Sequence, residues 1–424
     1  MKAGGVPVTA ELFIAFRYLL GRAKEGGRYL RGAALGIALS LIPIVVTLIV
    51  ADGMIRGITD RYIELGTGHL RLRRYFDSGE SPGDAARNIP GVRGIWRERQ
   101  GIGIVLGAKG KTGVAIRAVD GDFFAEPGSR RFLTVIDGAA DLDVPGGVLL
   151  GEELAASAGA ELGKTIHIMS LRRTASGAVL PRTIPLTVRG IVSSGYRELD
   201  ALWCIISAED GDRLLDASFA DDFYTVKIDA PYTKAGETAW RLAELLGPAW
   251  EVYTWKELQF SQYRSYESTR QILLFIMAMV VLVAAVHVSS ATSMLVIERR
   301  RDIAVLKAGG ASPAATGRVF MFASFLTGLL GAGAGIAAGL LIGYFINPLI
   351  HGLEAALSFF SSLFHGGEVK ILDPGYYLAE IPVVIDWRMV FLIGLFTVLC
   401  SVLASYLPAR GAGKLKPMEI LRRF

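Results

Sequence analysis

Four long apolar runs alternate with polar segments along the chain. An α-helix needs about 20 mostly apolar residues to cross a bilayer, and each run reaches that length. We therefore predict four transmembrane helices, at residues 32–52, 271–297, 319–350 and 388–408. About 30 residues precede the first run and no small-x-small cleavage site follows it, which favours an uncleaved anchor over a signal peptide.

The segment between the first two runs, residues 53–270, has the pattern of a folded domain. It contains about 200 residues, far more than a loop. Alternating and β-branched runs predict strands at 68–75, 164–170, 182–196 and 250–255, with a hairpin around Lys109-Gly110. Helices are predicted at 151–160 and 237–247. Because strands and helices follow no regular alternation, we predict an α+β domain. The polar residues 256–270 should extend the second transmembrane helix beyond the membrane.

The chain has 424 residues, of which 52% are hydrophobic and 20% are charged, and this mixture fits a membrane protein with a large water-exposed part. Lysine and arginine concentrate in residues 1–31, 298–318 and 409–424, whereas residues 351–387 carry few. The positive-inside rule therefore places both termini in the cytoplasm, and 53–270 and the short 351–387 loop outside.

An amphipathic helix is predicted at residues 9–20, before the first span. Thr9 is a suitable N-cap. The apolar residues recur at helical spacing, which favours a helix lying along the inner membrane surface. These residues are Leu12, Phe13, Phe16, Leu19 and Leu20.

A charged segment, ERRRDIAVLKAGGASP, links the second and third spans. We expect the second helix to continue through it until Gly309-Gly310, because glycine accepts the left-handed conformation that ends helices. Ser312 can then cap the next helix with Pro313 at its first position. Ile303 and Leu306 would be presented on this elbow as a docking surface for a soluble partner.

Four glycines recur every fourth residue in the third span and so share one helix face, which allows close helix contact. Packing within the chain and a subunit interface are both compatible with this pattern. The glycines are Gly331, Gly335, Gly339 and Gly343.

Residues for catalysis or metal binding do not form a recognisable group in the sequence. The run Glu161–Thr165 resembles the end of a phosphate-binding loop, but Ala158 stands where that motif requires glycine. Cys204 and Cys400 lie in different regions and are predicted to be unpaired. We expect no catalytic site, no metal site and no cofactor bound by this chain.

The elbow resembles the coupling loop of FtsX-like ABC transporter permeases, with their E-x-x-R-x-I-A-x-L-K-x-x-G-A-S pattern. The tail, YLPARGAGKLKPMEILR, is similar to the same family's ending. Within this MacB-like superfamily the chain looks like lipoprotein-releasing permeases of the LolC/LolE type. The stretches GHLRL, GVLLGEELA, VRGIVSSGYRELDALWCIIS and DPGYYLAEIPVVIDW carry that resemblance.

The resemblance implies a complex that extracts acylated lipoproteins from the inner membrane and passes them to a periplasmic carrier. Its partners would be two copies of a cytoplasmic ABC ATPase that uses ATP and Mg, a second permease protomer, identical or paralogous, and membrane lipid. Nucleic acid is not implied. The residues expected to couple to the ATPase are Glu298, Arg301, Asp302, Ile303, Leu306, Lys307, Gly310 and Ser312.

Two further sites follow from the resemblance. Arg172, Arg173 and Arg182 stand in a hairpin that matches the carrier-binding position of these permeases. A lipid cavity is expected to involve Ile44, Leu48, Ile276 and Val280. Two other functions share the topology: an efflux or peptide-resistance permease, and a transmembrane signal transmitter that activates a cell-wall hydrolase.

Overall fold

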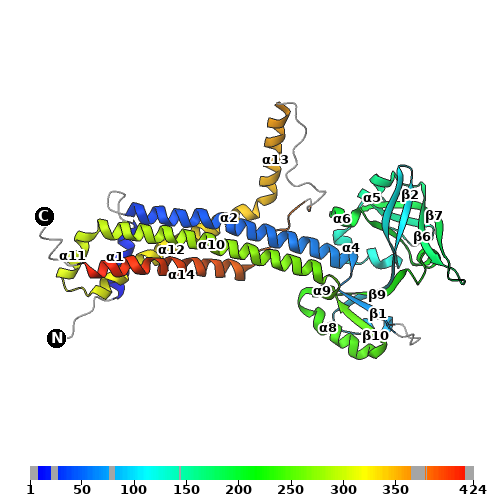
Figure 1. Cartoon of the computed structure of the whole chain (residues 1–424), viewed down its shortest axis with the longest axis horizontal. Coiled ribbons are helices and arrows are strands. Elements are labelled where there is room, and N and C mark those ends of the chain that lie inside the picture. The colour runs from blue at the N-terminus through cyan, green and yellow to red at the C-terminus, as the bar shows by residue number, and fades with distance from the viewer. Residues whose placement is uncertain are drawn as a thin grey trace. The chain divides into compact units, whose positions relative to one another are not determined.

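The computed structural model describes residues 8–20, 27–75, 82–142, 145–363, 378 and 380–415. The chain divides into two units (Figure 1). The helical unit comprises Met1–Gly53, Tyr266–Leu353 and Ile381–Phe424, and the second unit comprises Met54–Ser265 and Glu354–Glu380. Three helices, α2 (Gly27–Arg61), α10 (Phe260–Glu298) and α13 (Ile346–Leu363), contribute to both units.

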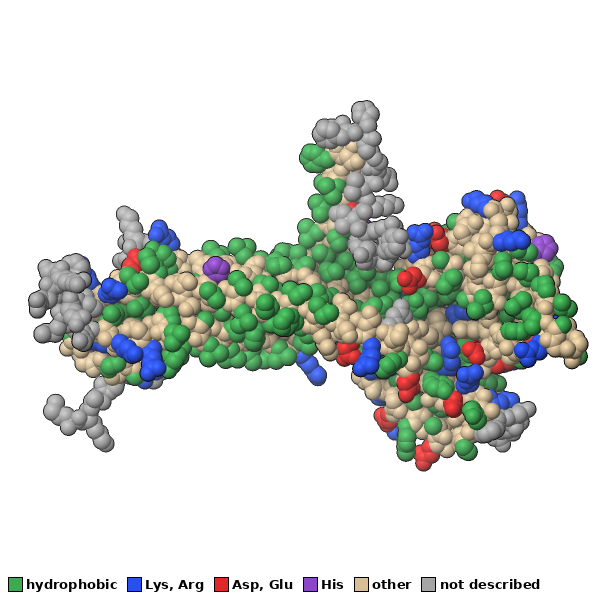
Figure 2. All heavy atoms as spheres, viewed as in Figure 1, with side chains coloured by type: hydrophobic (Ala, Val, Ile, Leu, Met, Phe, Trp, Pro, Cys, Tyr) green, Lys and Arg blue, Asp and Glu red, His purple; other side chains and the backbone are tan. Residues whose placement is uncertain are grey.

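The helical unit contains the predicted membrane-spanning helices. Among the described residues, α2, α10, α12 (Pro313–Tyr344) and α14 (Trp387–Lys414) are long and apolar enough to cross a membrane. Apolar side chains cover much of their outward surface (Figure 2). The unit also holds α1 (Val8–Leu20), α11 (Arg300–Ala308) and the start of α13 (Ile346–Leu363).

Several helix limits differ from the predicted ones. The helix α12 ends at Tyr344, so the last residues of the predicted 319–350 span belong to α13. That helix also occupies part of the segment predicted as a short loop. Thr9 lies inside α1, which begins at Val8, and therefore is not its N-cap.

The glycine face of α12 packs against α2 of the same chain. A Cβ atom at Gly335 would lie 2.8 Å from the Ala38 carbonyl oxygen and 2.8 Å from Leu41 Cβ. The other three glycines, Gly331, Gly339 and Gly343, likewise face Ile37, Val45 and Ile49. At Gly331, Gly335 and Gly339 a Cβ atom would meet backbone or Cβ atoms of α2, so only hydrogen fits there. This face is therefore covered within one chain and is not open to a second subunit.

One arginine links three of the long helices near the start of α14. Arg270 Nε on α10 lies 3.1 Å from Asp52 Oδ1 on α2, and Arg270 Nη2 lies 3.0 Å from Asp386 Oδ2. Asp386 also caps α14, because its Oδ1 accepts hydrogen bonds from the backbone N–H groups of Arg388 and Met389.

The second unit is an α+β domain, as predicted, built on a ten-stranded mixed sheet in the order β10-β1-β9-β2-β3-β8-β5-β7-β4, with β6 pairing to β2 and β7. The β3–β8 and β5–β7 pairs are parallel and the others are antiparallel. The strands are β1 (Leu70–Arg74), β2 (Val92–Gly107), β3 (Gly110–Val119), β4 (Thr134–Gly138), β5 (Gly147–Gly151), β6 (Thr165–Arg173), β7 (Val179–Ser193), β8 (Trp203–Ser207), β9 (Ala220–Ile228) and β10 (Trp250–Thr254).

Short helices cover and connect this sheet. They are η1 (Tyr62–Gly66), α3 (Gly83–Arg87), η2 (Gly121–Phe124), α4 (Pro127–Phe132), α5 (Glu152–Ala158), α6 (Arg197–Asp200), α7 (Ala208–Leu214), α8 (Pro231–Leu246), η3 (Gly247–Ala249) and α9 (Trp255–Leu258). The predicted hairpin is confirmed, since β2 and β3 pair down to Gly107 opposite Gly110. The expected extension of the second span is confirmed only from Phe260, because Lys256 belongs to the separate helix α9.

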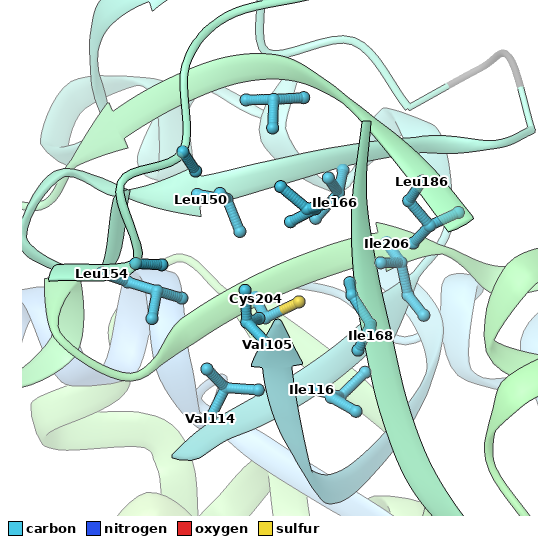
Figure 3. Packing of buried hydrophobic residues seen from close by; sticks show 14 of the residues in the cluster. Val105, Val114, Ile116, Leu150, Leu154, Ile166, Ile168, Leu186, Cys204 and Ile206 are labelled. Atoms are coloured by element: carbon cyan, nitrogen blue, oxygen red, sulfur yellow. The ribbon is translucent and has the colours of Figure 1, made fainter. Parts of the chain in front are cut away.

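Buried aliphatic side chains from β2, β3, β5, β6, β7, β8 and α5 form one core of the domain (Figure 3). Cys204 lies within it as a free thiol, and Cys400 is also free and buried, as the sequence predicts. Complete desolvation of Cys204 raises the pKa of its thiol, because the thiolate would have no water around it. This cysteine therefore acts as a packing residue.

A buried ion cluster fixes the end of α2 to the domain. Glu64, on η1 directly after α2, lies 3.0 Å from Arg93 Nη2 and 3.5 Å from Lys227 Nζ. Lys227 is fully buried and also contacts Glu126 Oε2 at 2.9 Å. His69 Nε2 lies 3.1 Å from the Glu64 carboxylate, and its Nδ1 accepts a hydrogen bond from the Ile228 N–H. Buried charges need such partners, because unpaired ones are costly.

Candidate functional site

The candidate site is the elbow, residues 298–312, between α10 and α12. The helix α10 ends at Glu298, and Arg299 leaves helical geometry with φ −94° and ψ 20° before α11 starts. The prediction that the second helix continues unbroken to Gly309 is therefore wrong. Arg299 Nη1 lies 3.0 Å from Asp302 Oδ2 and so bridges this break to the first turn of α11.

The end of the elbow follows the predicted turn chemistry. The N–H of Ala311 bonds to the Leu306 carbonyl and the N–H of Gly310 bonds to the Lys307 carbonyl, both at 3.0 Å. This is the Schellman pattern, which needs a residue with positive φ, and Gly310 has a φ of +96°. Ser312 then caps α12 by accepting from the Ala315 N–H, as predicted, with Pro313 at the first helical position.

Ile303 is a correction to the predicted docking surface. Its side chain is fully buried in a cluster with Tyr18 of α1, Leu295 of α10 and Phe320 of α12. It therefore holds the elbow in place and cannot contact a partner. Leu306 is half-buried, whereas Val305 is 64% exposed and had not been predicted. The sequence gives one indication that Val305 is exposed: it lies two positions after Ile303, and residues two apart lie on different sides of a helix.

Lys307 also has a structural role. Its Nζ donates to the carbonyl oxygens of Gly413 and Leu415, at 2.6 and 2.7 Å. A cation beside the last carbonyls of α14 satisfies acceptors that have no helical partner. Lys307 thus joins the elbow to the end of α14. A separate ion pair joins α1 to α12, since Arg318 Nη2 lies 2.7 Å from the carboxylate of the buried Glu11.

The exposed surface of the elbow consists of Glu298, Arg300, Arg301, Val305, Ala308–Gly310 and Ser312. Beside it lies a hollow of about 470 Å³ between the start of α12 and the end of α14, lined by Gly317, Met321, Tyr406, Arg410 and Lys414 among others. A small apolar contact surrounded by basic groups suits an acidic or amphipathic surface on another protein.

The three hairpin arginines do not form one patch. Ser170 pairs with Arg182 and Arg172 pairs with Leu180, so Arg172 and Arg182 share one face of the β6–β7 hairpin. Arg173 points to the other face, where its guanidinium stacks 5.7 Å from the Phe219 ring centre. Arg172 is exposed and Arg182 is half-buried. The apolar residues Leu171, Val179 and Leu180 on this hairpin are also exposed and were missed by the sequence reading.

The residues predicted to line a lipid cavity are separated by the structure. Ile44 and Leu48 are 4% and 3% exposed and lie inside the helix bundle. Ile276 and Val280 are 52% and 36% exposed on the outer side of α10. Within this chain, Ile44 and Leu48 are therefore core residues, and only Ile276 and Val280 face outward.

Comparison with known proteins identifies the family. Residues 274–417 match a family model for the FtsX-like permease C-terminal region, and residues 32–235 match one for the MacB-like periplasmic core domain. The chain is an FtsX-like permease with a MacB-like periplasmic domain. The elbow, α12 and α14 all lie within the first match, and most of the sheet domain lies within the second.

The permease is similar over its whole length to lipoprotein-releasing system proteins. LolC of Xylella fastidiosa is 25% identical over 96% of this chain and 98% of the relative. LolC of Neisseria meningitidis is 29% identical over 65% of this chain and 64% of the relative, and LolE of Haemophilus influenzae is 22% identical over 98% and 99%. Among solved structures, the periplasmic region of MacB from Actinobacillus actinomycetemcomitans covers 48% of this chain and 95% of its own, at 15% identity and a TM-score of 0.32.

Proposed function

We propose that this chain is the transmembrane permease subunit of an ATP-driven complex that extracts acylated lipoproteins from the inner membrane for transfer to a periplasmic carrier. The observation that carries the proposal is the similarity to LolC and LolE proteins across nearly the full chain. An ABC ATPase partner is consistent with the permease relatives. In this proposal the termini and the elbow face the cytoplasm.

The energetics of extraction explain why an ATPase is needed. Transfer of an acyl chain out of the bilayer costs about 0.8 kcal/mol per CH₂ group. Three long chains are therefore held by on the order of 30 kcal/mol, less whatever an apolar cavity recovers. Spontaneous release at that cost is negligible, so the work must come from a coupled reaction.

The elbow would receive that work. A partner that pushes on Val305 and Arg301 moves α11, which is held by the buried Ile303 and by the Lys307 contacts to α14. The displacement reaches α10, α12 and α14 together, because packed helices move as rigid elements. The glycine contacts between α12 and α2 then extend it to the fourth long helix.

Reconstitution tests the proposal. The permease, with its cognate ATPase and second protomer, is placed in proteoliposomes containing a triacylated lipoprotein, and a soluble carrier is added outside. We expect release to the carrier that requires ATP and Mg. Transport of unacylated peptide or drug instead would identify an efflux permease, and ATP-dependent activation of a hydrolase without any release would identify a signal transmitter.

A matched pair of variants tests the docking surface. Val305→Asp places a charge on the exposed position of the elbow, and we expect it to weaken ATPase binding by at least thirtyfold, which is typical of a central interface residue. Val305→Ile keeps an apolar, β-branched side chain at this position and should bind nearly normally. Leu306→Asp should act in the same direction. Equal binding by Val305→Asp and the parent chain would exclude this surface.

A further inference from the structure

A cavity of about 480 Å³ lies in the sheet domain, where η1 meets the sheet. Its volume falls in the range of small-molecule sites, roughly 300–1,000 Å³. The sheet supplies Arg71 from β1, Gln100 from β2, Arg117 from β3 and Trp203 from β8. The remaining lining residues include Tyr62, Thr67, Leu199, Leu202 and Gln259.

Arg117 is buried in the wall of this cavity with one donor unused. It is 3% exposed, and its Nε donates to Glu98 Oε1 at 2.7 Å while its Nη1 donates to the Leu65 carbonyl. Its Nη2 is buried and has no hydrogen-bond partner among the described residues. An unmet donor on a buried guanidinium is unusual, because the desolvation cost of the group is then not recovered.

Arg71 brings a second positive charge to the same wall. Its guanidinium carbon lies 3.7 Å from the centre of the Phe223 ring, and its buried Nε has no partner among the described residues. It forms no ion pair within the described part of the chain. Burial lowers the pKa of Arg71, and the charge of Arg117 lowers it further against the opposing effect of Glu98. Arg71 and Arg117 together carry two positive charges, and the single negative charge of Glu98 does not balance both.

The lining also includes apolar residues. Leu199 and Trp203 are buried, at 8% and 3% exposure, and Leu202 is half exposed. The Trp203 ring centre lies 5.9 Å from the guanidinium carbon of Arg117. The acidic lining residue Glu198 is exposed and so is solvated. The cavity thus combines two guanidinium groups in its lining with apolar residues that can accept a hydrocarbon chain.

We propose that this cavity binds an anionic amphiphile, with a carboxylate or phosphate head on Arg71 and Arg117 and an apolar tail along Leu202 and Trp203. Guanidinium groups are the preferred partners of both heads, since their donors match two oxygens at once. The site is separate from the elbow and does not depend on the transport function. The anionic head could belong to a lipid or to a free anion. Only a lipid would also use the apolar part of the cavity, so the tail distinguishes the two sources.

Calorimetry on the full chain in nanodiscs tests the site, with empty nanodiscs as the blank. Octyl phosphate and octanoate, both below micelle formation, should bind with one site per chain. Octyl glucoside, which has the same tail and no charge, should not bind. Inorganic phosphate should bind at least tenfold more weakly than octyl phosphate. Equal affinity for inorganic phosphate and octyl phosphate would show that the tail is not bound and would overturn the proposal of an amphiphile. Binding of octyl glucoside would show that no charged head is needed and would overturn the proposal of an anion.

Variants with matched controls assign the contacts. Arg71→Gln should weaken octyl phosphate binding by about tenfold or more, the effect of one charge-assisted hydrogen bond. Arg73→Gln removes the same charge two residues along β1, where Arg73 is exposed and paired with Asp221, and should leave binding unchanged. Leu202→Gln should weaken octyl phosphate but not inorganic phosphate. Thermal unfolding verifies that each variant is folded, and unchanged binding by folded Arg71→Gln would overturn the site.

Discussion

The Glu64 cluster permits a quantitative prediction about how α2 is held to the sheet domain. Burial alone raises the pKa of Glu64, but the hydrogen bond from His69 and the charges of Lys227 and Arg93 outweigh it and lower the pKa from 4.5 to about 2. Each pKa unit corresponds to about 1.4 kcal/mol, so the ionised carboxylate contributes about 3 kcal/mol to the domain. The side chain is 12% exposed, so solvent screens little of this.

The direction of the pH dependence follows from the lowered pKa. A carboxyl that is more acidic in the folded state stabilises it fully above its unfolded pKa, near 4.5, and the contribution is lost as the pH falls through about 2. The free energy of unfolding should therefore fall between pH 5 and pH 2. Glu64→Gln removes the carboxylate at every pH. The difference in the free energy of unfolding between the parent chain and this variant should therefore be largest at neutral pH and should disappear near pH 2.

Thermal unfolding of the full chain in detergent, followed by tryptophan fluorescence, measures the effect. Trp96 is a local reporter, because Lys227 Nζ lies 5.7 Å from its ring centre. We expect Glu64→Gln to lower Tm by about 6–12 °C at pH 7, from about 3 kcal/mol in a domain of this size. Glu161→Gln, at an exposed pair with Lys164, is the control and should have little effect. Equal shifts for the two variants at pH 7 would mean that the Glu64 carboxylate does not stabilise the domain.

Three further substitutions test other contacts. Gly335→Val should destabilise the helical unit by about 1–3 kcal/mol, because the new side chain is overpacked against α2. Gly333→Val is the control and should have little effect, since nothing lies within 4 Å of a Cβ atom at that position. Thermal unfolding in detergent measures both, and equal destabilisation would contradict the glycine contact. Lys307→Met should lower transport more than ATPase binding, because it frees the elbow from α14 without changing the exposed surface; an equal loss of both would argue against this. Arg172→Glu should slow carrier association at low salt more than Arg173→Glu, as surface plasmon resonance can measure; equal effects would exclude the face shared by Arg172 and Arg182.

Local chemistry made much of the elbow predictable. The cap at Ser312, Pro313 at the first helical position and the left-handed Gly310 depend on residues within a few positions of one another. The burial of Ile303 could not be predicted in this way, since it depends on Tyr18 and Phe320, which are distant in the sequence. The break at Arg299 was also missed, because no glycine or proline marks it.

The sheet domain shows the same division. The strands β1, β6, β7 and β10 and the β2–β3 hairpin were predicted from alternation, whereas β4, β5, β8 and β9 were missed, and the partners of each strand could not be predicted. Arg71 and Arg117 read as ordinary polar positions in two strands, and only the sheet order brings them to one cavity. The amphipathic pattern of α1 was recognised from its apolar residues. Its attachment through the buried Glu11 was not, because a lone glutamate in a first turn carries no sign of its partner.

The glycine contacts between α12 and α2 impose an order on biogenesis. In the sequence, the whole sheet domain and α10 stand between these two helices, so α2 enters the bilayer long before α12 is synthesised. Until then the α2 residues that meet the glycines, Ile37, Leu41 and Val45, lack this partner. A nascent chain that stalls before α12 would thus leave this side of α2 without the close backbone contact that the glycines supply in the finished bundle.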